Sequence, residues 1–150
     1  MKIVVDTNVA FSAILNTNSK IGDLLFNSGE LFTFYTCDYL QIELKRHKPK
    51  MLKVAKKMTE AQIDTTVSLV LGQITFINEN LIDESVWIAA QEIVKDIDVN
   101  DTDFVALNDQ LGALLWTGDK LLFSGLQEKG YTRVLNTDDL WTLRAHLRTS

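Results

Sequence analysis

The sequence contains little cysteine, proline or glycine. Its 150 residues include one Cys, one Pro and seven Gly. A single Cys excludes a disulfide framework and a cysteine-rich zinc site. So few Pro and Gly residues exclude a collagen-like, linker-like or low-complexity chain. With 46% hydrophobic and 23% charged residues, the chain has enough apolar surface to fold. Its length predicts one domain, residues 1–150, with its own core.

Long hydrophobic runs are also missing. The longest strictly apolar run is Val86–Ala90, whereas a membrane-spanning helix needs roughly 20 residues. Near the N-terminus, Asp6 interrupts the short apolar run that follows Lys2, so the hydrophobic region of a signal peptide is missing. We therefore expect a cytoplasmic protein with no membrane association.

Positive charge is concentrated in one segment. The formal net charge is −5, yet seven of the 15 Lys and Arg residues lie in the acid-free segment 45–57. This distribution argues against a general nucleic-acid coat, because the rest of the chain is strongly acidic. It is compatible with a local contact between this basic segment and a phosphate backbone.

Short apolar segments alternate with segments of helical periodicity. Thr59–Gln62 matches a capping box, Gly29, Gly72 and Gly112 are helix stops, and Pro49 ends or turns a helix. Asp101 and Thr137 are expected helix caps. The expected strands are 2–5, 31–36, 74–77, 113–117 and 132–135; the expected helices are about 9–27 with a break near 16–19, 38–49, 59–71, 81–97, 101–111, 120–128 and one from 137. The alternation predicts an α/β fold, a three-layer α/β/α sandwich with a central, mainly parallel sheet.

Acidic residues follow two of the expected strands. Asp6 ends the first strand, and Asp119 follows the strand at 113–117. Glu43 and Asp101 lie at or near the start of helices. Since ligands of open parallel sheets bind at the carboxyl ends of the strands, these four carboxylates can converge. An oxygen-only cluster of this kind suits a hard cation such as Mg²⁺ or Mn²⁺.

Each of these residues also has a purely structural interpretation. Asp6 can end a strand in an Asx-turn, Glu43 can be a solvated charge, and Asp101 can be a helix cap. Thr117–Lys120 can be a turn that leads into a helix. The ordered combination favours a functional site, because all four structural interpretations would have to hold independently.

The same residues resemble the motifs of the PIN-domain nucleases, in the right order and over nearly the whole chain. The matching segments are Val4-Val5-Asp6-Thr7-Asn8-Val9, then Glu43, then Asp101-Thr102-Asp103-Phe104-Val105-Ala106-Leu107, then Leu115-Trp116-Thr117-Gly118-Asp119-Lys120. The resemblance implies a parallel sheet between helices and a metal-dependent nuclease, in most members an endoribonuclease. Many small bacterial and archaeal members are toxins of toxin–antitoxin pairs of the VapC type.

Carried over residue by residue, the resemblance implies a role for each acid. Asp6, Asp101 and Asp119 would hold one or two Mg²⁺ or Mn²⁺ ions, and Glu43 would bind a metal through water or orient the nucleophile. Two polar side chains, Asn8 and Thr117, match the positions that support the acids. Asp98, Asp101 and Asp103 all lie at the third motif, and only one or two of them can face the site; Asp101 fits the family pattern best, and Asp98 and Asp103 are expected at the rim or in solvent. A metal-activated water would cleave single-stranded RNA and leave a 5′-phosphate and a 3′-hydroxyl.

The resemblance also implies partners. An antitoxin protein and a homodimer are expected, and the apolar residues Leu24, Leu25 and Phe26 could supply a dimer contact. We expect Lys45, Arg46 and Lys48 to guide RNA phosphates, because they directly follow Glu43.

Several residues have only structural interpretations. His47 is expected to be exposed, Cys37 to be a small buried hydrophobe and Trp116 to be a core residue.

Two other classes of function remain as alternatives. A phosphatase of the haloacid-dehalogenase type or a response-regulator receiver also has an Asp at the end of its first strand. The phosphatase needs a second acid where this chain has Asn8, and the receiver needs an earlier pair of acids. The second alternative class is a catalytically silent PIN fold that binds protein or RNA. The full set of acids argues against it.

Overall fold

The computed structural model describes residues 1–150 and contains one five-stranded sheet in which all strands are parallel. The spatial order is β3-β2-β1-β4-β5. The strands are β1 (Lys2–Val5), β2 (Thr33–Cys37), β3 (Ile74–Ile77), β4 (Leu114–Trp116) and β5 (Val134–Leu135). The first strand is the central one, and Val4 pairs with Tyr35 on one side and Leu115 on the other.

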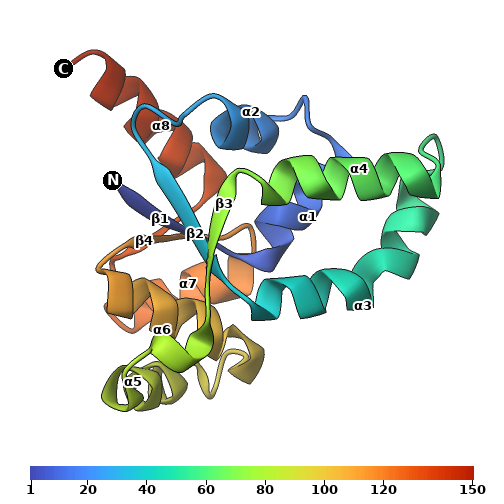
Figure 1. Cartoon of the computed structure of the whole chain (residues 1–150). Coiled ribbons are helices and arrows are strands. Elements are labelled where there is room, and N and C mark those ends of the chain that lie inside the picture. Colours follow the sequence, from blue (N-terminus) through green and yellow to red (C-terminus); the bar gives the residue numbers. More distant parts are fainter.

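Helices cover both faces of the sheet, which confirms the predicted α/β/α sandwich (Figure 1). One face carries α1 (Thr7–Leu15), α2 (Lys20–Phe26), α4 (Glu60–Leu71) and α8 (Thr137–Arg148), with α3 (Tyr39–Val54) beside α1. The other face carries α5 (Glu84–Val94), α6 (Thr102–Leu111) and α7 (Lys120–Glu128), and α6 packs on β1, β2 and β4. Two short 3₁₀ helices, η1 (Glu79–Leu81) and η2 (Val99–Asp101), precede α5 and α6.

Side-chain caps start five of the eight α-helices, among them α2 and α4. Ser19 accepts a hydrogen bond from the backbone N–H of Gly22, and Thr59 and Gln62 form the expected capping box. These contacts satisfy N–H groups that have no partner within the helix. The last helix is capped by Asn136 rather than by Thr137, because Asn136 forms a capping box with Asp139.

Two predicted helix boundaries and one predicted helix cap are wrong. Helix α3 continues through Pro49 to Val54, because Lys45 and Pro49 both lie on the exposed side, where water can hydrate the carbonyl that proline leaves without a donor. The helix predicted over 81–97 is shorter: Ile82 and Asp83 adopt extended backbone before α5 begins. Asp101 precedes α6 but makes no side-chain capping bond.

The core is continuous across both layers. Trp116 and Phe104 are among its largest fully buried side chains, and Cys37 is also buried. Leu24 and Leu25 belong to this core, so they are not available as the dimer contact suggested from the sequence. None of the helices has the length and apolar character needed to span a membrane.

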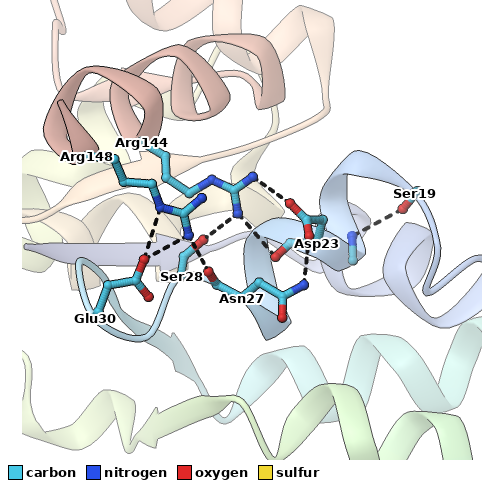
Figure 2. A network of polar contacts seen from close by, with 8 residues as sticks. Ser19, Asp23, Asn27, Ser28, Glu30, Arg144 and Arg148 are labelled. Atoms are coloured by element: carbon cyan, nitrogen blue, oxygen red, sulfur yellow. Dashed lines mark hydrogen bonds and ion pairs between the residues drawn. The ribbon is translucent and has the colours of Figure 1, made fainter.

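A buried arginine joins α2 to α8. Arg144 is 4% exposed and donates hydrogen bonds to the carboxylate of Asp23 and the hydroxyl of Ser28, as Figure 2 shows. Its guanidinium holds the pKa of Asp23 below the usual value. One turn further along α8, Arg148 pairs with Glu30 at the surface. Arg144 therefore joins α8 to α2 through a partly buried ion pair, and Arg148 joins α8 to the loop after α2 through an exposed one.

These two pairs predict different effects on stability. Arg144→Ala should lower the free energy of unfolding by about 2–4 kcal/mol, because it leaves buried polar groups without partners. Arg148→Ala should change stability far less, because its pair is solvated and screened. Urea unfolding of both variants tests this difference, and equal losses would contradict the special role of Arg144.

Candidate active site

The acidic residues gather at the carboxyl edge of the sheet, beside its central strand. From β1 the chain first adds β2 and β3 on one side of the sheet. It then returns and adds β4 and β5 on the other side of β1. This reversal of direction opens a crevice at the carboxyl ends of β1 and β4. Asp6 directly follows β1, and Thr117 and Asp119 follow β4.

Asp6 is fixed by its neighbours on both strands. Its backbone N–H donates to the carbonyl of Trp116, which extends the β1–β4 ladder. One carboxylate oxygen accepts from the backbone N–H of Thr7 at 2.7 Å, and the other accepts from the Thr117 hydroxyl at 2.7 Å. The side chain is 4% exposed. Asp6 thus caps α1 and is also held against the end of β4.

The loop after β4 is held by a second set of polar contacts. Asp119 caps α7, and its Oδ1 accepts from the N–H groups of Leu121 and Leu122 at 2.9 and 3.2 Å. The backbone N–H of Asp119 donates to the Thr117 hydroxyl, and the N–H of Gly118 donates to Asn8 Oδ1 at 3.0 Å. The Thr117 hydroxyl therefore bridges Asp6 and the backbone of Asp119, and Asn8 holds the loop after β4 through Gly118.

Glu43 reaches the site from α3. Its Oε1 accepts a hydrogen bond of 2.6 Å from the Thr7 hydroxyl, the residue directly after Asp6. This contact links α1 to α3 at the edge of the sheet and leaves the second carboxylate oxygen of Glu43 without a hydrogen bond to the protein. The sequence placed Glu43 by position alone, and the structure brings it into the pocket.

Asp101 has a buried carboxylate oxygen without a hydrogen-bond partner. The side chain is 9% exposed, and the unpartnered atom is its Oδ2. An unpartnered buried carboxylate oxygen is unfavourable, so such atoms in folded proteins call for an explanation. Together with the neighbouring acids, this oxygen fits a hard cation bound by carboxylates.

Two of the acids have strongly raised pKa values. Burial raises the pKa of Asp101 to about 8, with further contributions from the charges of Asp6, Asp98, Asp119 and Glu43. Burial also raises the pKa of Asp6 to about 6, although its hydrogen bonds from Thr117 and Thr7 oppose the shift. Groups so perturbed in a cleft are typical of functional sites.

These residues line one pocket of about 280 Å³. The lining residues are Asp6, Thr7, Asn8, Phe11, Glu43, His47, Lys50, Asp98, Asn100, Asp101 and Asp119. Asp98 is exposed and still lines the pocket. Asp103 is half-buried and does not line the pocket; it lies with Cys37 and Glu79, and the possible ligand atoms of these three are within 4.8 Å of one another. The acids of the pocket do not form such a tight group.

The cations at the pocket differ from those expected. Lys48 pairs with Glu60 and Asp64 on α4, and Arg46 packs on the ring of Tyr39. Neither these two nor Lys45 lines the pocket, whereas Lys50 does.

Five lining residues were not predicted as site residues: Thr7, Phe11, His47, Lys50 and Asn100. Helical spacing could have found three of them, because His47 and Lys50 lie four and seven residues after Glu43, and Phe11 lies four after Thr7.

Comparison with known proteins identifies the family. The family model of the PIN domain matches residues 4–146, so the chain belongs to the PIN-domain family, whose members are generally nucleases. This membership decides against the phosphatase and receiver alternatives. No curated protein matches the chain significantly.

Two solved structures share the fold. The structure of VapBC2 from Rickettsia felis bound to a DNA fragment from their promoter matches with a TM-score of 0.66 and 15% identity, over 91% of this chain and 98% of the other. PAE2754 from Pyrobaculum aerophilum matches with a TM-score of 0.66 and 12% identity, over 100% of this chain and 91% of the other. At such low identity, the likeness extends to the fold alone.

The raised pKa values predict how stability depends on pH. The folded chain binds protons at Asp6 and Asp101 more tightly than the unfolded chain does, so this stability is complete below about pH 4 and is lost as the pH rises toward 8. In EDTA, the free energy of unfolding should therefore fall between pH 5 and pH 8 by at least about 1 kcal/mol.

Asp101→Asn should remove the largest single part of this fall, because the amide carries no charge to desolvate. Burial raises the pKa values of Asp6 and Asp103 to about 6, and these two acids account for the rest. Glu84→Gln, at an exposed acid on α5, should leave the profile as it is. Urea unfolding across this pH range measures both variants, and an unchanged profile in Asp101→Asn would contradict the assignment.

Proposed function

We propose that the protein is a metal-dependent endoribonuclease that cleaves single-stranded RNA with an activated water. The observation that carries the proposal is the buried, unpartnered Oδ2 of Asp101 in a pocket lined by four further acids. Membership of the PIN-domain family supports hydrolysis of phosphodiester bonds. The exposed His47 and Lys50 at the same pocket suit an anionic substrate.

The chain divides the work between its acids. Asp6, Asp101 and Asp119 would hold one or two Mg²⁺ or Mn²⁺ ions, which supply water activation and stabilise charge on the leaving 3′-oxygen when bound. Asp119 offers Oδ2, since its Oδ1 is occupied by the cap of α7. Glu43, fixed by Thr7, would orient the attacking water with its free oxygen. Thr117 holds Asp6 and the backbone of Asp119, and Asn8 holds the backbone of Gly118, which keeps the loop after β4 in place. The products would carry a 5′-phosphate and a 3′-hydroxyl.

The biological setting we infer is a toxin–antitoxin pair in the cytoplasm. The VapBC2 structure from Rickettsia felis has a similar fold, and many small members of this family are VapC-type toxins. An antitoxin protein would then be the partner, and its binding would block access of RNA to the pocket. A PIN fold that only binds RNA or protein remains the alternative, and it is separated from the enzyme by the cleavage assay.

Cleavage should depend on the metal and on the pocket acids. A mixed single-stranded RNA should be cut in Mg²⁺ or Mn²⁺ and not in EDTA. Asp101→Asn and Asp6→Asn should each lower kcat/KM by about 100-fold or more, because the loss of a charged ligand weakens transition-state stabilisation.

Asp103→Asn is the matched control, since this acid lies two residues after Asp101, in the first turn of α6, but outside the pocket. It should keep near wild-type activity. Cleavage that persists in EDTA, or an equal loss in Asp103→Asn, would contradict the proposed site. Binding of RNA without any cleavage would favour the silent module.

The family resemblance also predicts a homodimer. Light scattering at micromolar concentration should give twice the mass of one chain, because small PIN proteins commonly pair. The mass of a single chain would contradict this expectation without affecting the proposed chemistry.

A further inference from the structure

Two helices form the outer wall of the acidic pocket. Thr7, Asn8 and Phe11 line it from α1, and Glu43, His47 and Lys50 line it from α3. Within each helix these residues share one face. The Thr7–Glu43 hydrogen bond joins the helices beside the sheet, and the contact between Phe11 and His47 joins them about one turn further out. The wall therefore changes from acidic at the sheet to aromatic and basic at its outer end.

Phe11 is the one hydrophobic residue of this pocket. It is half-buried, which leaves part of its ring accessible at the surface of the wall. His47 stands edge-on to the ring, with 5.9 Å between centroids at an angle of 75°. The ammonium group of Lys50 lies 5.7 Å from the ring centroid. An accessible aromatic ring beside two basic side chains is unusual in a pocket otherwise lined by acids and amides.

Lys50 differs from its neighbour Lys48 in having no ion-pair partner. Lys48 is held by Glu60 and Asp64, while the contact of Lys50 is with the Phe11 ring alone. An exposed cation–π contact is weaker than the stacking of a nucleobase on an aromatic ring. An incoming base can therefore displace the ammonium group, which is then free to pair with a phosphate.

We propose that Phe11, His47 and Lys50 form a nucleotide-binding subsite, in which one unpaired base stacks on Phe11 and its phosphate binds Lys50. This inference rests on the proposed ribonuclease function and names what the pocket binds next to the cleaved bond. It also explains a requirement for single-stranded RNA, because a base inside a duplex cannot reach the ring. A basic partner peptide is disfavoured here, since His47 and Lys50 flank the ring.

RNA that lacks one base tests the subsite directly. The cleavage position is first mapped on an unmodified single-stranded RNA. Each flanking nucleotide is then replaced in turn by an abasic one, which keeps the phosphates. For the wild-type protein with Mg²⁺, kcat/KM should fall about tenfold at one position, and the change should lie mainly in KM.

Variants of Phe11 separate stacking from packing. Phe11→Leu keeps an apolar side chain of similar bulk, so it should fold normally. It should lose about tenfold on intact RNA and show no further loss on the abasic RNA. Phe11→Trp should retain the difference between the two RNAs. If Phe11→Leu still distinguishes intact from abasic RNA, the ring is not the stacking surface and the proposal is overturned.

A charge variant tests the phosphate contact. Lys50→Gln should weaken cleavage of intact and abasic RNA by the same factor and should reduce the slope of log(kcat/KM) against log(salt) by about one. Lys2→Gln removes the same charge at the opposite edge of the sheet and should change neither quantity. An unchanged salt slope in Lys50→Gln would overturn the role given to Lys50.

The outcomes for the two proposals are distinct. A wild-type protein that cuts no RNA would overturn the ribonuclease function itself. A wild-type protein that cuts intact and abasic RNA equally well at every position would overturn the subsite alone. In that case the aromatic wall would face another occupant, such as a protein partner.

Discussion

The burial of carboxylates that are held together at one edge of the sheet is the constraint on which the rest of the structure depends, and their mutual repulsion adds to it. Asp6 and Asp101 are largely buried, and their charges oppose one another and those of Glu43 and Asp119. Hydrogen bonds hold Asp6 and Asp119 in place, whereas the buried Oδ2 of Asp101 has no partner. Thr117 and Thr7 hold Asp6, and the start of α7 holds Asp119. The surrounding core, with Trp116 at its centre, supplies the rigidity that makes this arrangement persist. These buried acids thus lower the stability of the folded chain, and the same arrangement suits the binding of a cation.

The parts of this site that the sequence predicts are those set by local chain geometry. Asp6 and Asp119 each come at or just after the end of a short apolar strand, and the parallel sheet then brings them to one edge whatever the details of packing. The capping box at Thr59 and the helix stop at Gly112 are equally local, since each depends on a few adjacent residues. The overall layers follow from the alternation of such elements, and for this reason the three-layer sandwich was predictable.

The remaining features depend on how helices rotate and pack, which periodicity does not determine. Asp103 and Asp101 are two residues apart, yet only Asp101 faces the pocket. Lys48 and Lys50 also differ by two residues, and one is neutralised by α4 while the other borders the site. Arg144 pairs with Asp23, which lies 121 residues earlier in the sequence. Pro49 lies inside α3 because the side of the helix on which it falls is exposed to water, a fact of tertiary structure.

The position of β1 in the middle of the sheet limits the order in which the sheet and the pocket can form. This strand pairs with β2, about 30 residues later in the chain, and with β4, about 110 residues later. The side of β1 that pairs with β4 therefore has no partner until β4 has been made. Contacts between residues distant in the sequence dominate folding as a result. The crevice at the ends of β1 and β4 arises in that same late step. During synthesis on a ribosome, a chain that lacks β4 has neither a complete sheet nor the Thr117 hydroxyl that holds Asp6, so the pocket forms only after β4 has been made.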